Sequence, residues 1–339
     1  MLINNADYFI LLEKIKEQIR AAQYRAVLGV NREEILLYWN IGKVILGSSS
    51  YGSSFVENLA RDIKLDFPGA KGYSVRNLRY MKKFAALVTD EEKVQTLSAV
   101  LTWSHNKHLF DKTKTLDEYL WYAAQTIENG WSLSSLEYHV STKTYQRQAL
   151  SDKTTNYKTL LPQPQSNLAT ETLKSPYVFD FVEQREGIIE REIEAEMVAN
   201  IAKTIMELGT GFGFHGSQYH LEVSGKDYYL DLLFYNTKLH CYVVIELKNT
   251  EFKPEYAGKL NFYLSAVDDL LRSESDSPSI GILLCKERDK LTAEYALRDI
   301  NKPIGVSEYK LSDFVPQELA DTLPSAEDIE RRIKDKYEV

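Results

Sequence analysis

A chain of 339 residues, with 44% hydrophobic and 27% charged residues, has the composition of a globular protein and the length of two ordinary domains. The composition excludes a disordered or fibrous chain, and the net charge of -8 by itself argues against a nucleic-acid partner. The charge is uneven, however, because residues 1–160 hold 21 Lys and Arg against 17 Asp and Glu.

The first predicted domain, residues 1–150, is all-helical. Apolar residues recur at helical steps, as at Leu11, Ile15 and Ile19. Signals that end helices lie at residues 47–50, 68–69 and 129–130. The pattern predicts several helices, and the mildly basic charge of this half suits a domain that holds a polyanion.

One helix of this domain is a candidate DNA-recognition helix. Ser74 follows a Pro-Gly turn and is a natural N-cap for a helix that runs to about residue 88. Arg76, Arg79 and Lys83 share one face of that helix, because they are three and four residues apart. A helix-turn-helix domain places such a helix in the major groove of DNA. The alternative is a solvated basic face.

A polar segment with three prolines, residues 151–176, predicts an interdomain linker. The domain after it, residues 177–339, is predicted to be α/β with the element order α-β-β-β-α-β. Its elements are expected at 186–207 (helix), 218–223, 227–235 and 240–248 (strands), 254–272 (helix) and 279–285 (strand). A helix at 291–299, a strand at 304–311 and a charged helical tail follow.

The second and third of these strands carry charged residues inside apolar runs. Glu246 and Lys248 are two residues apart and therefore share one face of their strand. Charges in such a setting are costly unless they are paired or used. A symmetrical hairpin around Asn236 would place Asp231 opposite Tyr242, on the same face as the other two charges. That register leaves Asp231 and Glu246 roughly 13 Å apart on a flat sheet, so twist or a bulge would have to close the gap.

These residue types match the needs of phosphodiester hydrolysis. Mg²⁺ takes carboxylate and carbonyl oxygens, so Asp231, Glu246 and the carbonyl of Leu247 are candidate ligands, with Mn²⁺ as a substitute ion. Lys248 would orient the attacking water or stabilise the pentavalent oxyanion. By residue types alone the pattern is weak, and a surface ion pair is the alternative.

Several segments of the C-terminal half together form a more specific pattern. They are QYHLEV at 218–223, DLLFY at 231–235, VIELK at 244–248, FKPEYAG at 252–258, IGILLCK at 280–286 and NKPIGV at 301–306. They resemble the YhcG family of PD-(D/E)XK nucleases over nearly all of this half, and Trp103, His105 and residues 128–131 resemble the N-terminal domain of that family. The resemblance implies a helical N-terminal domain and a restriction-endonuclease-like αβββαβ core.

The resemblance also adds residues to the site. Glu194 matches a helix carboxylate that assists metal binding directly or through water, with a solvated helix charge as the alternative. Gln218 matches a polar residue near the site, with a strand-edge hydrogen bond as the alternative. Lys259 stands where the family pattern has Gln, and its ammonium is still able to contact a phosphate oxygen. Tyr263 follows on the same face, either as a catalytic aid or as a core residue.

The implied function is that of a Mg²⁺-dependent DNA endonuclease in host defence, restriction, or DNA recombination and repair. DNA and partner proteins of a defence system are the expected partners, and a homodimer is expected because one site cuts one strand. The alternative is a non-catalytic DNA-binding or assembly module with a degenerate nuclease fold. Retention of Asp231, Glu246 and Lys248 favours the enzyme, and a pure helix-turn-helix regulator would leave these residues unexplained.

The sequence contains no sign of export or of a membrane anchor. It lacks a basic stretch followed by an apolar leader, and no apolar run approaches the roughly 18 residues that span a bilayer. Cys241 and Cys285 lie in apolar runs and are expected to be buried thiols. A cytoplasmic protein with no membrane partner is the expectation.

Overall fold

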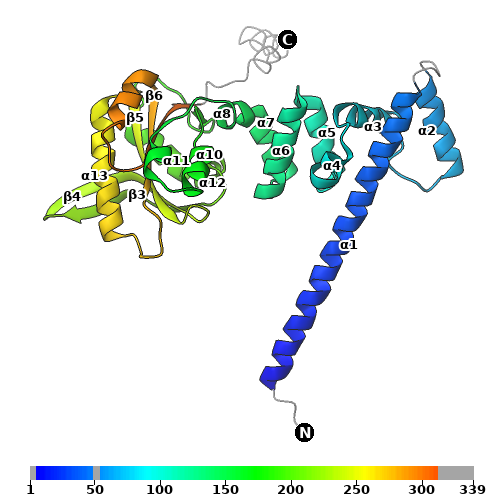
Figure 1. Cartoon of the computed structure of the whole chain (residues 1–339), viewed down its shortest axis with the longest axis horizontal. Coiled ribbons are helices and arrows are strands. Elements are labelled where there is room, and N and C mark those ends of the chain that lie inside the picture. Colours follow the sequence, from blue (N-terminus) through cyan, green and yellow to red (C-terminus); the bar gives the residue numbers. More distant parts are fainter. Residues whose placement is uncertain (1–4, 49–53, 312–339) are drawn as a thin grey trace, which may run out of the picture. The chain divides into compact units, whose positions relative to one another are not determined.

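The computed structural model describes residues 5–48 and 54–311, which divide into two units (Figure 1). Unit 1 is Met1–Val140 and unit 2 is Ser141–Val339. The charged tail predicted after residue 311 lies outside the described residues. In the described part of the chain, no helix is both long enough and apolar enough to cross a membrane.

The described part of unit 1 is entirely helical, which confirms the prediction for this half. Its helices are α1 (Asn5–Gly47), α2 (Phe55–Asp66), α3 (Val75–Leu87), α4 (Glu91–Lys93), the π-helix η2 (Val94–Ser98), α5 (Trp103–Lys112), α6 (Leu116–Asn129) and α7 (Leu133–Ser141). α1 and α3 pack closely because Gly42 has no side chain, and a Cβ there would overlap the backbone of Met81. Tyr38, Ile45 and Leu78 complete the buried contact.

The helix ends of unit 1 lie where turn and capping residues predicted them. α1 ends at Gly47, and α6 ends before Gly130, whose positive φ of 62° closes the helix in the left-handed conformation. Ser74 caps α3, because its hydroxyl accepts a hydrogen bond from the backbone N–H of Asn77 at 3.3 Å. Local signals therefore set these boundaries.

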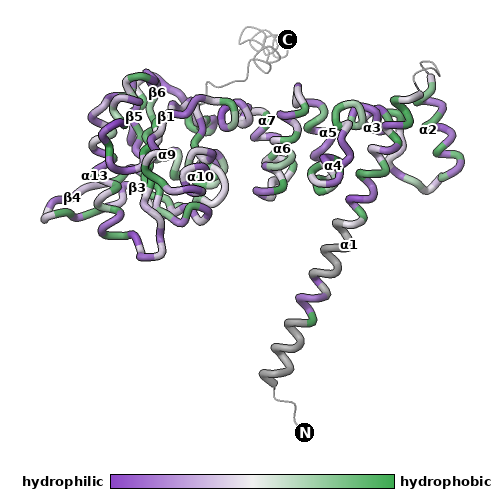
Figure 2. Tube along the Cα trace, viewed as in Figure 1, coloured by the Kyte–Doolittle hydropathy of each residue, from purple (hydrophilic) through white to green (hydrophobic). Residues whose placement is uncertain are grey.

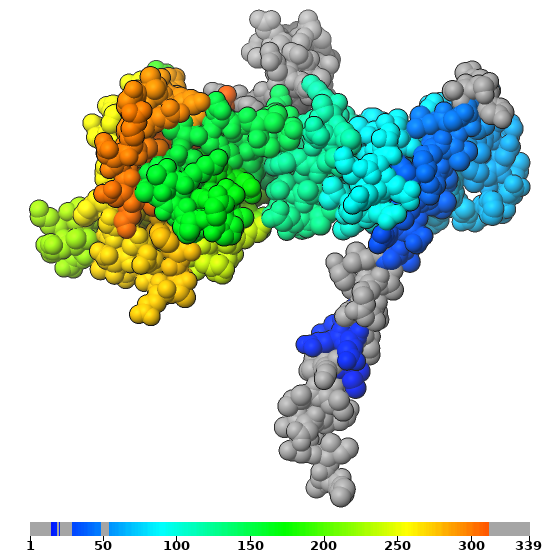
Figure 3. Space-filling view, viewed as in Figure 1, coloured from blue at the N-terminus to red at the C-terminus, as the bar shows by residue number. Residues whose placement is uncertain are grey.

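Unit 2 is built on a mixed sheet with the strand order β1-β7-β6-β5-β4-β3. Its strands are β1 (Thr154–Thr155), β2 (Tyr177–Val178), β3 (Phe212–Val223), β4 (Lys226–Asn236), β5 (Cys241–Glu251), β6 (Ile280–Glu287) and β7 (Ile304–Lys310). β3, β4 and β5 are antiparallel neighbours, whereas β5, β6 and β7 run parallel, and β2 adds a short parallel pairing to β7. The hairpin that joins β3 and β4 projects from the body of unit 2 (Figure 1 and Figure 3).

Helices cover both faces of this sheet. The helices of unit 2 are α8 (Thr144–Gln148), α9 (Tyr157–Leu160), α10 (Gln165–Thr172), α11 (Glu190–Ala199), α12 (Ile201–Leu208), α13 (Pro254–Leu270) and α14 (Lys290–Leu297). α9 to α12 share one apolar core with Leu247, and α13 and α14 share the other with Val244, so β5 is buried on both faces. Hydrophobic stretches follow these central strands in Figure 2. The order of α11 and α12, three strands, α13 and β6 confirms the predicted αβββαβ core.

The helix predicted at 186–207 is two helices. α11 ends at Ala199, α12 begins at Ile201, and Asn200 between them has a non-helical φ of -111° and ψ of 39°. The Asn200 amide donates a hydrogen bond to the Glu196 carbonyl at 3.0 Å, and Asn side chains compete in this way with helix hydrogen bonds. The apolar residues keep helical spacing on both sides of Asn200, so the sequence pattern did not show the break between the two helices.

Residues 151–176 are a packed part of unit 2 rather than the predicted linker. They contain β1, α9 and α10, and Tyr157, Leu161 and Leu173 are buried in the core. The Tyr157 hydroxyl donates to the Gly281 carbonyl at 2.9 Å. The prolines lie in turns between these short elements, so composition alone resembled a linker. The expected domain boundary at 150 correspondingly moves to 140, and α8 belongs to unit 2.

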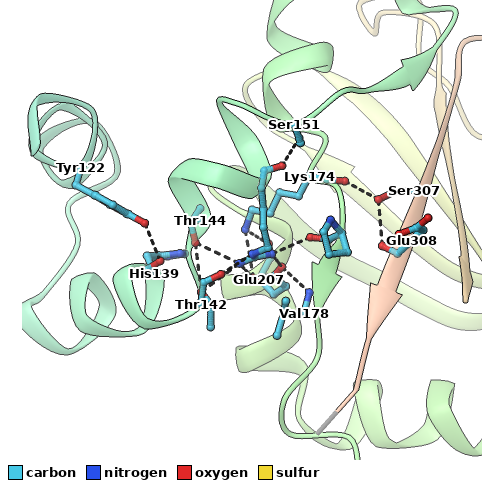
Figure 4. Close-up of polar contacts among 12 residues, drawn as sticks. Tyr122, His139, Thr142, Thr144, Ser151, Lys174, Val178, Glu207, Ser307 and Glu308 are labelled. Atoms are coloured by element: carbon cyan, nitrogen blue, oxygen red, sulfur yellow. Dashed lines mark hydrogen bonds and ion pairs between the residues drawn. The ribbon is translucent and has the colours of Figure 1, made fainter. Parts of the chain in front are cut away.

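A buried ion pair fastens α8 to this unit. Arg147 contacts both carboxylate oxygens of Glu207, Nη1 with Oε1 at 2.5 Å and Nη2 with Oε2 at 3.3 Å. Lys174 lies 3.4 Å from Oε2, and the backbone N–H of Val178 donates to Oε1 at 2.9 Å (Figure 4). The three charged side chains are at most 5% exposed. Such a group stabilises a fold only as a complete set, because each charge depends on its partners.

Breaking the buried set of Arg147, Lys174 and Glu207 should destabilise the folded protein. We expect Arg147→Met to lower the free energy of unfolding by about 3–5 kcal/mol, because it leaves the buried Glu207 carboxylate without its guanidinium partner. Lys290→Met is the matched control, because Lys290 pairs with Asp152 on the surface, and it should change stability little. Urea unfolding of the full chain compares the two, and equally small losses would contradict the role given to Arg147.

Candidate active site

The register of β4 and β5 brings Asp231 level with Glu246. Leu232 pairs with Ile245, so Asp231 lies one step beyond that pair, beside Glu246. The predicted position of Asp231 opposite Tyr242 is therefore wrong by four residues. The prediction of a shared face is unaffected, because a slip of an even number of residues keeps a side chain on the same face.

A longer connection between the strands explains the difference. Asn236 pairs with Cys241, which leaves residues 237–240 as the loop instead of a tight symmetrical turn. The Asn236 Oδ1 accepts hydrogen bonds from the backbone N–H groups of Lys238 and Leu239, both at 3.0 Å. With this register, no unusual twist is needed to bring the two carboxylates together.

Asp231 is held from both neighbouring strands. The backbone N–H of Leu247 donates to Asp231 Oδ2 at 2.8 Å, which ties this carboxylate to β5. On the other side, the pairing of β3 with β4 places Gln218 across from Asp231. Gln218 has a positive φ of 44° and follows a register shift between Phe214 and Gly216. Such irregularities re-aim side chains next to functional sites.

Lys248 is held by three oxygen atoms. Its ammonium lies 2.7 Å from the Leu247 carbonyl, 3.0 Å from Glu246 Oε1 and 3.0 Å from Glu190 Oε2. The other oxygen of Glu190 accepts the backbone N–H of Asn249 at 3.0 Å. The Lys248 side chain is 11% exposed. The first residue of α11 therefore helps to fix the position of this ammonium.

Glu190 was not singled out by the sequence. It lies in a helix rich in glutamate, where neither its type nor its spacing distinguishes it. The available signal was the environment of Lys248, because a largely buried ammonium needs more than one acceptor. Locating the second acceptor requires the packing of α11 on β5, which the sequence did not provide.

α13 brings Lys259 and Tyr263 to the same carboxylate. The Lys259 ammonium lies 2.5 Å from Glu246 Oε1 and 5.1 Å from the centre of the Tyr263 ring. Tyr263 is 5% exposed and belongs to the core that also contains Leu260. Lys259 therefore contacts the site directly, and Tyr263 supports it from the core.

Glu194 and Gln218 form a hydrogen-bonded pair beside Asp231 and Glu246. The Gln218 amide donates to Glu194 Oε2 at 2.6 Å, and Glu194 is only 5% exposed. Burial raises the pKa of Glu194, and the charge of Glu246 contributes to the rise. Glu194 is therefore not a solvated helix charge, and Gln218 bonds a carboxylate rather than a strand edge.

The charges of Asp231, Glu246, Lys248 and Lys259 depend on one another. Burial raises the pKa of Asp231 well above its ordinary value, and the Glu246 carboxylate raises it further. Burial, the largest single influence, lowers the pKa values of Lys248 and Lys259, but the nearby negative groups, Glu246 foremost and Asp231 with it, together outweigh burial and raise both pKa values. Both lysines therefore stay protonated, whereas the negative charge of Asp231 is unfavourable unless a further cation approaches.

The oxygen atoms of this site fit a hard divalent cation. Asp231, Glu246 and the Leu247 carbonyl are the donor types that Mg²⁺ and Mn²⁺ prefer. Within residues 5–48 and 54–311, Glu246 Oε2 is buried and has no hydrogen-bond partner, which is costly for a carboxylate oxygen. No group of three or more His, Cys, Asp or Glu in those ranges could hold a metal. The carbonyl and water molecules would therefore have to complete the shell.

A second candidate surface lies on α3. A depression of about 460 Å³ is lined by Val75, Arg76, Arg79, Tyr80 and Lys83. The three predicted basic residues therefore do share an exposed face. Acidic neighbours neutralise part of it, since Arg79 lies 2.5 Å from Glu57 and Lys83 lies 3.1 Å from Asp111. These ion pairs are exposed and therefore weak, so the cations can exchange partners.

The fold and the strand residues of unit 2 define a nuclease domain of the PD-(D/E)XK class. Residues 170–324 match the family model described as the YhcG PDDEXK nuclease domain, and residues 14–147 match the DUF1016 N-terminal domain. The chain belongs to the YhcG-like family of PD-(D/E)XK nucleases and carries both domains of that family. The resemblance stated from the sequence is confirmed.

One relative is similar over nearly its whole length. The Escherichia coli (strain K12) protein "Putative nuclease YhcG" is 27% identical over 354 residues, which cover 94% of each chain. Two solved structures, a repair endonuclease from Pyrococcus abyssi and the EndoMS-dsDNA2 complex, are each 18% identical with a TM-score of 0.26. The matches cover 38% of this chain and 48% and 47% of those chains. Similarity at this level carries no weight beside the family models.

Neutralising Asp231 should stabilise the protein. Asp231→Asn keeps an oxygen that accepts from the Leu247 N–H but removes the negative charge beside Glu246. We expect the free energy of unfolding in EDTA to rise by about 1 kcal/mol, as is common when a functional-site charge is removed. Thermal unfolding measures the change, with the exposed Asp227→Asn as the control. A lower melting temperature for Asp231→Asn would contradict the electrostatic description of this site.

Proposed function

We propose that this chain is a divalent-metal-dependent DNA endonuclease. The observation that carries the proposal is the meeting of Asp231, Glu246 and Lys248 on two adjacent strands, with Asp231 tied to the β5 backbone. Two carboxylates beside an ammonium supply both cation ligands and a positive group for a phosphodiester. Mg²⁺ is the proposed ion and Mn²⁺ its substitute.

The roles of the central residues follow from their contacts. Asp231, Glu246 and the Leu247 carbonyl would hold the ion, which when bound supplies Lewis-acid activation of the phosphodiester and lowers the pKa of a water. Lys248 donates hydrogen bonds to the attacking water or to a phosphate oxygen as negative charge develops there. Glu190 keeps the Lys248 ammonium at one position, so little reorganisation is needed during the reaction.

The surrounding residues support this centre. Glu194 is proposed to assist the ion through a water, and Gln218 orients Glu194 through their 2.6 Å hydrogen bond. Lys259 is proposed to contact a phosphate oxygen of the substrate, and Tyr263 supports its stem from the core. Each of these residues acts on charge or orientation rather than as the nucleophile.

Unit 1 supplies the proposed DNA contact. Arg76, Arg79 and Lys83 face outward from α3, and phosphate oxygens would replace the acidic partners of Arg79 and Lys83. A two-fold homodimer is the proposed form for double-strand cleavage, because one site cuts one strand. Host defence, restriction, or recombination and repair is the proposed setting.

The cleavage test compares wild type with Asp231→Ala. Purified protein is incubated with plasmid, linear and branched DNA in Mg²⁺, Mn²⁺ or EDTA, and products are resolved on gels. We expect metal-dependent cutting that Asp231→Ala reduces at least about a thousandfold, the effect of losing about 4 kcal/mol of barrier lowering. The exposed Asp227→Ala should cut like wild type. If the wild type binds DNA but cuts none of these substrates in either metal, the non-catalytic binding module is the better account.

The DNA-binding test uses Arg76→Ala combined with Lys83→Ala. Loss of two phosphate contacts should weaken binding and lower the slope of log K against log salt concentration by about 2. Fluorescence anisotropy with a labelled duplex at several salt concentrations measures both quantities. Arg61→Ala combined with Lys64→Ala, on α2, removes the same charge elsewhere in unit 1. An equal loss of affinity in both double variants would show that α3 is not a specific contact.

A further inference from the structure

Two ammonium groups converge on one oxygen of Glu246. Lys259 lies 2.5 Å and Lys248 lies 3.0 Å from Glu246 Oε1, and the carboxylate is completely buried. At this oxygen one carboxylate therefore faces two positive charges, of which Lys248 also neutralises Glu190. A divalent cation that binds Glu246 must enter against both of them, because like charges at such distances repel strongly in a partly buried site.

The two lysines differ in how firmly they are held. Lys248 also donates to the Leu247 carbonyl and to Glu190, and its side chain is 11% exposed. Lys259 reaches the site from α13, and its side chain is 43% exposed. Moving Lys248 away from Glu246 would therefore also disturb its contacts with the Leu247 carbonyl and Glu190, whereas Lys259 can turn toward solvent. The free-energy cost of leaving Glu246 is smaller for Lys259.

We propose that Lys259 is an exchangeable counter-ion of Glu246, which leaves Oε1 when a divalent cation binds and then contacts a phosphate of the bound strand. This inference rests on the proposed metal site. Lys259 and the metal compete for one carboxylate, so the residue lowers the affinity of the protein for the ion. A phosphate that attracts Lys259 removes the competitor, and metal and substrate then bind cooperatively by linkage.

The ammonium of Lys259 is what makes the exchange possible, because an uncharged amide at this position would not neutralise Glu246. Replacing Lys259 by Gln should therefore remove the competition without removing a hydrogen-bonding group. Replacing it by Met removes both, and so separates loss of the ammonium from gain of an amide oxygen as a metal ligand.

The test is the binding of Mn²⁺ alone, measured by isothermal titration calorimetry on the full chain at constant pH and ionic strength. We expect Lys259→Gln and Lys259→Met each to bind Mn²⁺ about tenfold more tightly than wild type. Lys253→Gln, at the exposed N-cap of α13, removes the same charge nearby and should stay within about twofold of wild type. Circular dichroism verifies that each variant is folded.

The remaining outcomes separate this inference from the proposed function. If wild type and both Lys259 variants bind Mn²⁺ equally, and Asp231→Ala abolishes the binding, the metal site stands and the exchange is wrong. Tightening in Lys259→Gln but not in Lys259→Met would mean that the amide is a ligand, and tightening in Lys253→Gln as well would mean a general charge effect. Either result overturns the exchange. Absence of Mn²⁺ binding in every folded variant overturns both the metal site and the inference.

Discussion

Burial of the Glu246 carboxylate on the central part of the sheet is the constraint on which the rest of the site depends. A carboxylate with no exposed surface persists only beside positive charge, and Lys248 and Lys259 supply it from β5 and α13. Glu190 then holds Lys248, and the Leu247 N–H holds Asp231. Residues from β4, β5, α11 and α13 are thus fixed around this carboxylate, which is the pre-organisation that phosphodiester chemistry requires.

The same arrangement explains why the site is costly to maintain. Asp231 lies beside Glu246 and has a raised pKa, because burial and the second carboxylate both disfavour its charge. Apolar packing on both faces of β5 stabilises the strand that carries Glu246 and so offsets part of this cost.

The sequence predicted the order of elements and the shared face of the site because both follow from local periodicity. Strands β3 to β6 and helix α13 were placed within a few residues, except that β3 begins six residues before its predicted start. The β4–β5 register was missed, because the loop at 237–240 depends on hydrogen bonds of the Asn236 side chain. The contact of Glu190 with Lys248, 58 residues away, and the core position of Tyr157 were missed because they depend on long-range packing.

The central claim is that Asp231 and Glu246 share one divalent cation, and Mn²⁺ can be located directly by its anomalous scattering in crystals of the protein. The account predicts an anomalous peak within about 2.0–2.4 Å of a carboxylate oxygen of each residue, with the Leu247 carbonyl in the same shell. A peak elsewhere, or two carboxylates that face separate surroundings with no ion between them, would contradict it.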